Sequence, residues 1–182
     1  MPRRGLAVLA LALPLAGCFG QAPSLHPLFT DTAAVPVLGA WTSGDGDPLT
    51  FERHGDHYEA DFRNKNCKDD DCAIRLDVRF GRLSGRLFAD FVQHDGRDAI
   101  GSWPVHAFAR VELTKDRLEF SVLDRKWMGQ ALDQKLLQLK HETVDGEVVL
   151  TAPTSELQRV LTEWSSHPDA FGQVTAFTRR SR

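Results

Sequence analysis

The sequence predicts a mainly β protein with one domain, in which an antiparallel meander closes into a barrel of about eight strands. Through most of the chain after residue 39, apolar and polar residues alternate, which is typical of strands with one buried face. Turn signals such as Asp145-Gly146 separate the alternating segments at short intervals. Only two segments, 124–134 and 154–166, have helical periodicity instead. Many short strands in such a meander favour a closed barrel over a helical or α/β fold.

Residues 1–17 have the composition of a secretory signal peptide. Arg3 and Arg4 precede an apolar run, and small residues come directly before Cys18. The stretch Leu15-Ala16-Gly17-Cys18 resembles the lipobox of bacterial lipoproteins. In that family the signal is cleaved before the cysteine, which is acylated on its sulfur and on its new amino group. The resemblance therefore implies that Cys18 is the lipidated first residue of the mature protein.

Two other interpretations of this N-terminus are weaker. An uncleaved membrane anchor is less favoured because Pro14 breaks the apolar run, which is shorter than the ~20 residues of a spanning helix. An ordinary secretion signal would require the cysteine to stand at the cleavage site by chance. Phe19 follows Cys18, whereas an aspartate at that position retains lipoproteins at the inner membrane of enteric bacteria. The resemblance thus implies a cell-envelope protein at the periplasmic face of the outer membrane.

Cleavage leaves 165 residues, enough for one domain with a core of its own. This mature part carries 20 basic and 25 acidic side chains, a negative balance that argues against a nucleic-acid partner. No apolar run of transmembrane length follows Cys18, so the lipid is the only membrane attachment that we expect. Residues 18–37 are predicted to form the lipidated N-terminus and tether, and 38–182 the barrel domain. Within the tether, residues 24–29 are expected to lie extended against the body.

The pair Cys67 and Cys72 remains once Cys18 is modified. Because the chain is predicted to leave the cytoplasm, we expect these two cysteines to form a disulfide that closes a short acidic loop. The alternatives are a cation site that adds residues 69–71, or a calcium loop that also uses Asn64 and Asn66. Neither has a recognised ligand spacing, and the loop lacks the usual turn glycine, so no metal site is predicted.

About eight to nine strands are expected. Turns are predicted at Gly55-Asp56, at Gly81-Arg82 and at the cysteine-closed loop. Because successive strands are joined by short turns, each is expected to pair with the next one. The segments are 49–53, 57–63, 72–80, 83–92, 103–111, 118–122, 137–141, 148–150 and 173–178.

The two helical segments have recognisable starts. Asp124 is placed to cap the short helix near 124–134. The helix near 154–166 follows Pro153 and has apolar residues at i, i+3, i+4 and i+7, from Leu157 to Trp164. Its apolar stripe must cover another element, and we expect it on the outside or at one mouth of the barrel.

The segment Gly39-Ala40-Trp41 opens the strand pattern and resembles the Gly-x-Trp signature of lipocalins. In that family the tryptophan closes the blind end of the barrel beneath an arginine from near the C-terminus. The resemblance implies a lipocalin-like barrel in which Arg179 or Arg180 supplies that arginine. The family's second motif, Thr-Asp-Tyr, is missing from this chain.

A second resemblance spans most of the mature chain. The lipobox, residues 24–28, Gly39-x-Trp41, 104–108, 139–142 and 150–154 together are similar to a group of uncharacterised bacterial lipoproteins. That group implies a location and an architecture but no activity, substrate or cofactor.

His106 and His141 are the candidate ligand-binding residues, because each shares a strand face with apolar side chains and is expected to point into the barrel or a shielded seam. The alternative for each is a hydrogen-bonded core histidine. We find no motif for a catalytic nucleophile, a phosphate loop or a cofactor, so no catalytic residue is predicted.

Two functions follow from these features. The first is a non-enzymatic interaction module whose exposed helix or edge strand docks an unknown envelope protein. The second is a lipocalin-like carrier or sensor whose barrel holds a small apolar or amphipathic molecule. Several inward positions carry large side chains, which favours a filled barrel and the first function. They are Tyr58, Phe62, Phe80, Phe91 and Trp103.

Overall fold

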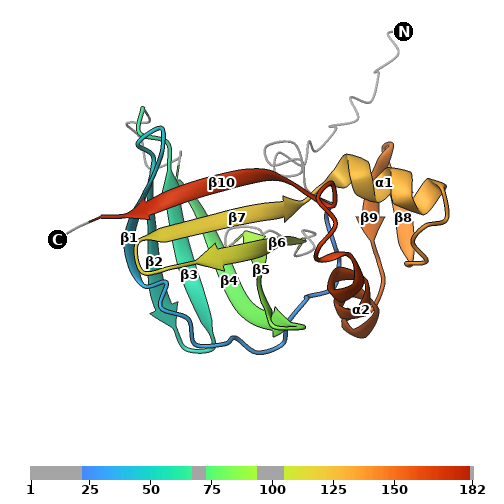
Figure 1. Ribbon diagram of the computed structural model, residues 1–182, viewed down its shortest axis with the longest axis horizontal. Helices are drawn as coiled ribbons and strands as arrows, with labels where there is room; N and C mark the ends of the chain where they lie inside the picture. The colour runs from blue at the N-terminus through green and yellow to red at the C-terminus, as the bar shows by residue number, and fades with distance from the viewer. Residues whose placement is uncertain (1–21, 67–72, 94–104, 181–182) are drawn as a thin grey trace, which may run out of the picture.

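The computed structural model describes residues 22–66, 73–93 and 105–180. Eight strands close into an antiparallel barrel, which confirms the predicted fold class (Figure 1). Each strand pairs with the next along the chain until β7, which pairs with β10, and β10 pairs with β1 to close the ring. The barrel strands are β1 (Gly39–Ser43), β2 (Pro48–His54), β3 (His57–Arg63), β4 (Ala73–Leu83), β5 (Arg86–Gln93), β6 (His106–Leu113), β7 (Arg117–Leu123) and β10 (Phe171–Arg179).

The segment between β7 and β10 forms a separate layer beside the barrel (Figure 1). It contains α1 (Arg125–Asp133), the hairpin β8 (His141–Val144) and β9 (Glu147–Leu150), and α2 (Thr154–Trp164). Both predicted helices are present. The Asp124 carboxylate caps α1 as predicted, because it accepts the Trp127 N–H at 2.6 Å. The hairpin is a two-stranded sheet of its own, outside the barrel.

The barrel interior is filled by large side chains, which we call the inner core. The Phe120 ring lies 5.3 Å from that of Phe91, and the Tyr58 ring lies 5.4 Å from that of Phe80. Of the predicted inward residues, only Trp103 lies outside the described part of the chain. The buried members are Val37, Trp41, Leu49, Phe51, Tyr58, Ala60, Val78, Phe80, Leu87, Ala89, Ala109, Val111, Leu118, Phe120 and Phe177.

A second cluster, the outer core, lies between the outside of the barrel and the added layer. The predicted stripe of α2 is buried in it, at Leu157, Val160 and Leu161. The stripe therefore covers the outside of the barrel, as α2 contacts β4. The other members are Ala22, Leu28, Phe29, Leu83, Phe88, Phe108, Leu123, Met128, Ala131, Leu132, Leu137, Leu139, Leu150, Ala152, Ala170 and Phe171.

Residues 22–38, which we call the strap, belong to the domain and not to a free tether. Ala22 and Leu28 are fully buried in the outer core. Ser24 bridges His106 at the start of β6 on one side and Leu150 of β9 on the other. The ordered domain therefore begins well before residue 38, the predicted boundary, because the strap supplies apolar surface to both cores.

Two predicted boundaries differ from the structure. The prediction of a turn at Gly81-Arg82 was wrong. Strand β4 continues to Leu83, and Ser84 and Gly85 make the turn with φ values of 47° and 81°. Gly81 is instead needed for packing, since a Cβ there would lie 2.3 Å from the Phe29 ring of the strap. The segment 137–141 is also not a strand, because pairing begins only at His141.

Candidate functional site

Trp41 near the start of β1 pairs with Arg179 at the end of β10, and we call this end of the barrel the blind end. Gly39 has a φ of 106°, which favours glycine, and it precedes the fully buried Trp41. The Trp41 indole N–H donates to the Val37 carbonyl of the strap at 2.7 Å. The strap thereby closes this end of the barrel, and Trp41 is packed beneath it.

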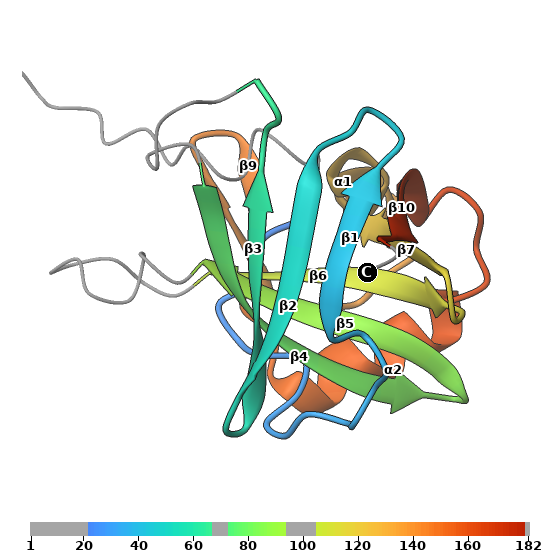
Figure 2. The ribbon, with the colours of Figure 1, turned by 90° about the vertical axis from the view of Figure 1, so that its left-hand side faces the viewer.

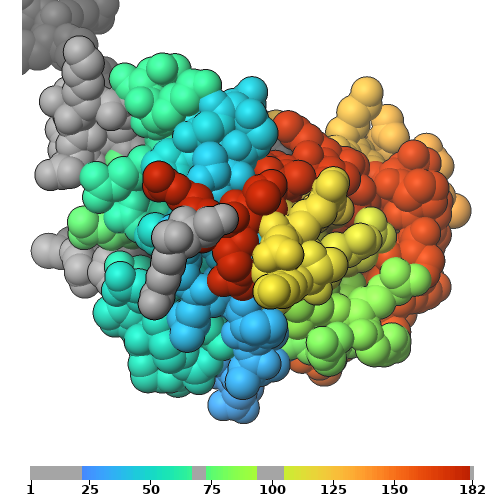
Figure 3. Space-filling view, turned by 60° about the vertical axis from the view of Figure 1, so that its left-hand side comes forward, coloured from blue at the N-terminus to red at the C-terminus, as the bar shows by residue number. Residues whose placement is uncertain are grey.

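Arg179, rather than Arg180, is the arginine over Trp41. Its guanidinium carbon lies 4.1 Å from the centre of the indole ring, within cation–π distance. The same guanidinium donates to three carbonyls, those of Lys115 at 2.7 Å, Leu38 at 2.8 Å and Pro36 at 2.7 Å. Figure 3 shows the end of β10, the β6–β7 turn and the strap side by side on this face. Arg179 therefore joins three segments that are distant in sequence.

His106 lies in a shielded seam, one of the two locations that its sequence pattern predicts. It is 8% exposed, on the outer face of the barrel beneath the strap. Its Nδ1 lies 2.8 Å from Oδ1 of the buried Asp90 on β5, and Asp90 Oδ2 accepts the Leu28 N–H at 2.7 Å. Because a carboxylate only accepts, the imidazole proton sits on Nδ1. Asp90 thus ties both His106 and the strap to the barrel wall.

The N-terminal turn of α2 holds the strap from the other side. The Thr154 hydroxyl donates to the Pro27 carbonyl at 2.6 Å, and the Gln158 amide donates to the Leu28 carbonyl at 2.8 Å. The Ser24 hydroxyl donates locally to the His26 carbonyl at 2.9 Å. In the described part of the chain, no hydroxyl or thiol is hydrogen-bonded to His106. Asp90, Thr154 and Gln158 thus hold the strap from both sides.

His141 does not lie where its pattern predicts. It is exposed at the start of β8, while Leu137 and Leu139 are buried. Its Nδ1 lies 2.9 Å from the Leu139 carbonyl oxygen. The prediction that His141 shares a strand face with Leu137 and Leu139 was wrong. The three residues do not lie in one strand, so their spacing of two does not place them on the same side.

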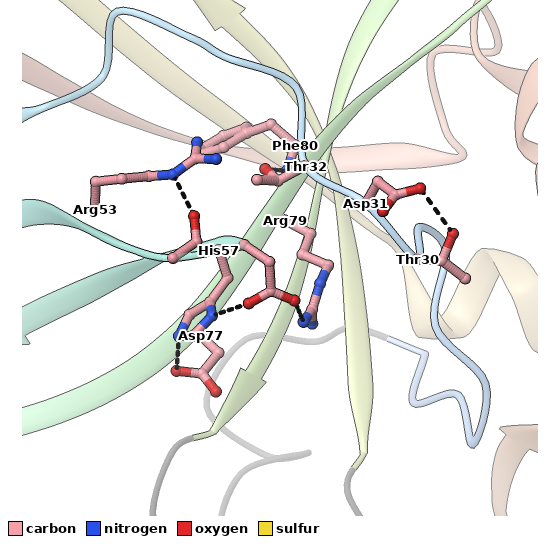
Figure 4. A network of polar contacts seen from close by, with 10 residues as sticks. Thr30, Asp31, Thr32, Arg53, His57, Asp77, Arg79 and Phe80 are labelled. Atoms are coloured by element: carbon pink, nitrogen blue, oxygen red, sulfur yellow. Dashed lines mark hydrogen bonds and ion pairs between the residues drawn. The ribbon is translucent and has the colours of Figure 1, made fainter.

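A polar network that the sequence did not reveal lies on the outside of β3 and β4, near the β2–β3 turn (Figure 4). His57 stands between two carboxylates, with Nδ1 2.9 Å from Asp56 and Nε2 3.4 Å from the buried Asp77. Arg79 donates to the other Asp56 oxygen at 2.9 Å. These hydrogen bonds, from His57 first and then Arg79, hold the pKa of Asp56 well below its usual range.

Two clefts among the described residues are open and carry charged walls. One, of about 380 Å³, lies at the blind end between strap residues 34–36 and the β4–β5 turn. Its three arginines each donate to the protein: Arg82 to the Gly85 carbonyl, Arg86 to the Ser166 hydroxyl and Arg110 to the Ser165 carbonyl after α2. The second, of about 300 Å³, lies between α1 and the start of β9. Neither is an apolar cavity inside the barrel.

Several predicted residues lie outside the described residues. Cys18, Cys67 and Cys72 are among them, so the lipidation and the disulfide stay predictions. Across residues 22–66, 73–93 and 105–180, no three His, Cys, Asp or Glu side chains are grouped to hold a metal ion. In the same ranges, no helix has the length and apolar character to cross a membrane.

Sequence reasoning missed Asp90 as the partner of His106, although a signal was present. On β5, Phe88 and Val92 are buried on the outer face while Leu87 and Ala89 are buried on the inner face. A strand that is apolar on both faces is covered on both. Asp90, at an outer position between Phe88 and Val92, therefore had to be buried with a partner.

The fold defines the class of protein: a closed eight-stranded antiparallel barrel, with two helices and a β-hairpin inserted before its last strand. Comparison of the chain with protein-family models, with curated proteins and with solved structures finds no match in any of the three.

Proposed function

We propose that this protein is a lipid-anchored, non-enzymatic interaction module of the bacterial cell envelope, which docks an envelope partner through its outer surface. The observation that supports this best is the filled barrel interior. The Phe120 ring alone lies within 6.5 Å of three other phenylalanine rings. A barrel filled in this way leaves its outside as the surface available for binding.

The lipid anchor in this proposal depends on the lipobox at Cys18. Ala22, four positions after that cysteine, is buried in the domain, so a lipid on Cys18 would hold the domain close to a membrane. Phe19 after the cysteine favours the periplasmic face of the outer membrane.

The alternative function is a lipocalin-like carrier or sensor of a small apolar molecule. It requires a shielded apolar cavity of several hundred Å³. The clefts described above have a suitable volume, but they are open and are lined in part by Arg82, Glu112 or Asp133. The carrier is therefore the less supported of the two functions.

The anchor is tested by the substitution Cys18→Ser in the organism's own envelope. We expect the variant to leave the membrane fraction, because the only predicted acylation site is lost. Phe19→Ala is the matched control, since it changes the next residue and keeps the thiol, and it should stay in the membrane fraction. A Cys18→Ser protein that is processed and still sediments with membranes would contradict the proposal.

A further inference from the structure

The strap enters the domain very close to the proposed lipid. Ala22 is fully buried, and its N–H donates to the Leu123 carbonyl at 3.2 Å. It lies four positions after Cys18, with three residues between them, and a fully extended chain over these four steps spans only ~14 Å. The nine residues of β10 span ~30 Å along the barrel wall. The short connection therefore restricts which part of the molecule can reach the bilayer.

The strand pairing shows from which side the chain reaches Ala22. Ser24 and Leu150 form a parallel bridge, in which the Leu150 N–H donates to the Pro23 carbonyl at 2.8 Å and the Leu25 N–H to the Leu150 carbonyl at 2.9 Å. Because parallel segments run in the same direction, the start of β9 lies on the side from which the strap comes. The turn that joins β8 to β9 is thus the part of the hairpin nearest to the arriving chain.

The hairpin tip is exposed, and it combines the apolar Val144 with the acidic Asp145. Val144 at the tip is 50% exposed and belongs to neither core. An ion pair between Arg125 and Glu147 joins the start of α1 to the start of β9, so the tip is braced against the helix. Figure 2 shows this hairpin at the upper edge of the molecule with the end of β3, whereas the β2–β3 turn lies at the lower edge.

We propose that the β8–β9 tip lies against the headgroup surface of the bilayer that holds the lipid of Cys18, with the β2–β3 turn pointing away from it. This inference rests on the proposed lipid anchor. The short tether brings the tip to the membrane, where Val144 can meet the apolar boundary while the neighbouring Asp145 stays among the headgroups. The blind end, with Trp41 and Arg179, is then presented to partners away from the membrane.

The test uses nitroxide labels on the lipidated full protein in vesicles of phosphatidylethanolamine and phosphatidylglycerol. Val144→Cys places the label at the tip, and His54→Cys places a matched label at the exposed end of β2. Collision with a water-soluble nickel chelate should be several-fold lower at position 144 than at position 54. Collision with oxygen, which concentrates in lipid, should be higher at position 144. The protein without an added cysteine reports background labelling at Cys67 and Cys72.

Two further measurements separate the orientation from the anchor. A variant with ten glycine and serine residues inserted between Phe19 and Gly20 should float with the vesicles but lose the protection at position 144. Equal accessibility at the two labels on floating protein would overturn the orientation alone. Protection that survives the longer tether would overturn the short tether as its cause. Protein that does not float with the vesicles would overturn the lipid anchor and the orientation together.

Discussion

The inner and outer cores are built on different principles, although both are fully buried. The inner core takes alternate residues from strands that pair with their neighbours in the chain. The outer core joins segments from opposite ends of the sequence, as in the bond from Thr154 to Pro27, which spans 127 residues. Local alternation is sufficient to specify the first core, whereas the second depends on a few long-range polar anchors.

The largest effect is expected in the inner core. Phe120→Ala removes a ring that contacts three others, and large-to-small core changes of this kind cost ~3–5 kcal/mol of unfolding free energy. Urea unfolding followed by circular dichroism measures the loss, with Phe120→Leu as a milder control. A loss below ~1 kcal/mol would show that the interior has room to adjust and is not filled.

The next effect concerns the polar anchor of the outer core. Asp90→Ala leaves the His106 Nδ1–H and the Leu28 N–H without their buried acceptor, so we expect a loss of ~3 kcal/mol. Asp90→Asn keeps one acceptor oxygen and should lose less. Limited proteolysis adds a local readout, because the strap should be cut faster in the alanine variant. An unchanged cutting rate would mean that Asp90 does not hold the strap.

A smaller effect is expected at the blind end, where the strap meets both β10 and the β6–β7 turn. Arg179→Ala removes three hydrogen bonds and the contact with Trp41 at a partly exposed site, so the loss should be ~1–2 kcal/mol. Arg180→Ala is the matched control, because the bond that Arg180 makes to the described residues comes from its backbone N–H, which donates to the Ala40 carbonyl. If the two variants lose the same stability in urea, the arginine over Trp41 is not what joins these segments.

The smallest effect belongs to a network outside both cores. The pKa of Asp56 is lowered by His57 and Arg79, so ionised Asp56 stabilises the folded state. This contribution is fully present above the unfolded-state pKa of ~3.9 and is lost as the pH falls through the lower folded-state value. Asp56→Asn should therefore reduce stability near neutral pH and flatten its decline in acid. A variant with an unchanged pH profile in urea titrations would assign the acid sensitivity to other carboxylates.

Much of the barrel could be predicted from sequence, because the alternation that marks each strand is contained within a few neighbouring residues. Alternation placed residues such as Tyr58 and Phe80 inside, and Asp124 marked the start of α1. The β8–β9 hairpin could not be told from barrel strands, since its alternation is the same and only long-range packing separates it. The turn at Gly81 was wrongly predicted because long-range packing is not visible in the local sequence. Gly81 is needed to make room for the Phe29 ring, more than fifty residues away.

The candidate sites were harder to predict than the fold. The lipocalin resemblance led to Trp41 and limited the arginine to two neighbours, and the register of β10 selects Arg179. The role of His106 depends on Asp90 and on a strap that has no periodicity of its own. The sequence indicates which residues are chemically able to form such a site, but not which neighbours the tertiary structure brings to them.

The central claim is that a filled barrel is anchored by a lipid on Cys18 and acts through its outside. Native mass spectrometry of the protein released gently from its own membrane tests this most directly. We expect one species that begins at Cys18, carries the acyl groups covalently and has no other small molecule bound. A protein that is unmodified at Cys18, or one that releases a small apolar molecule on activation, would contradict the account.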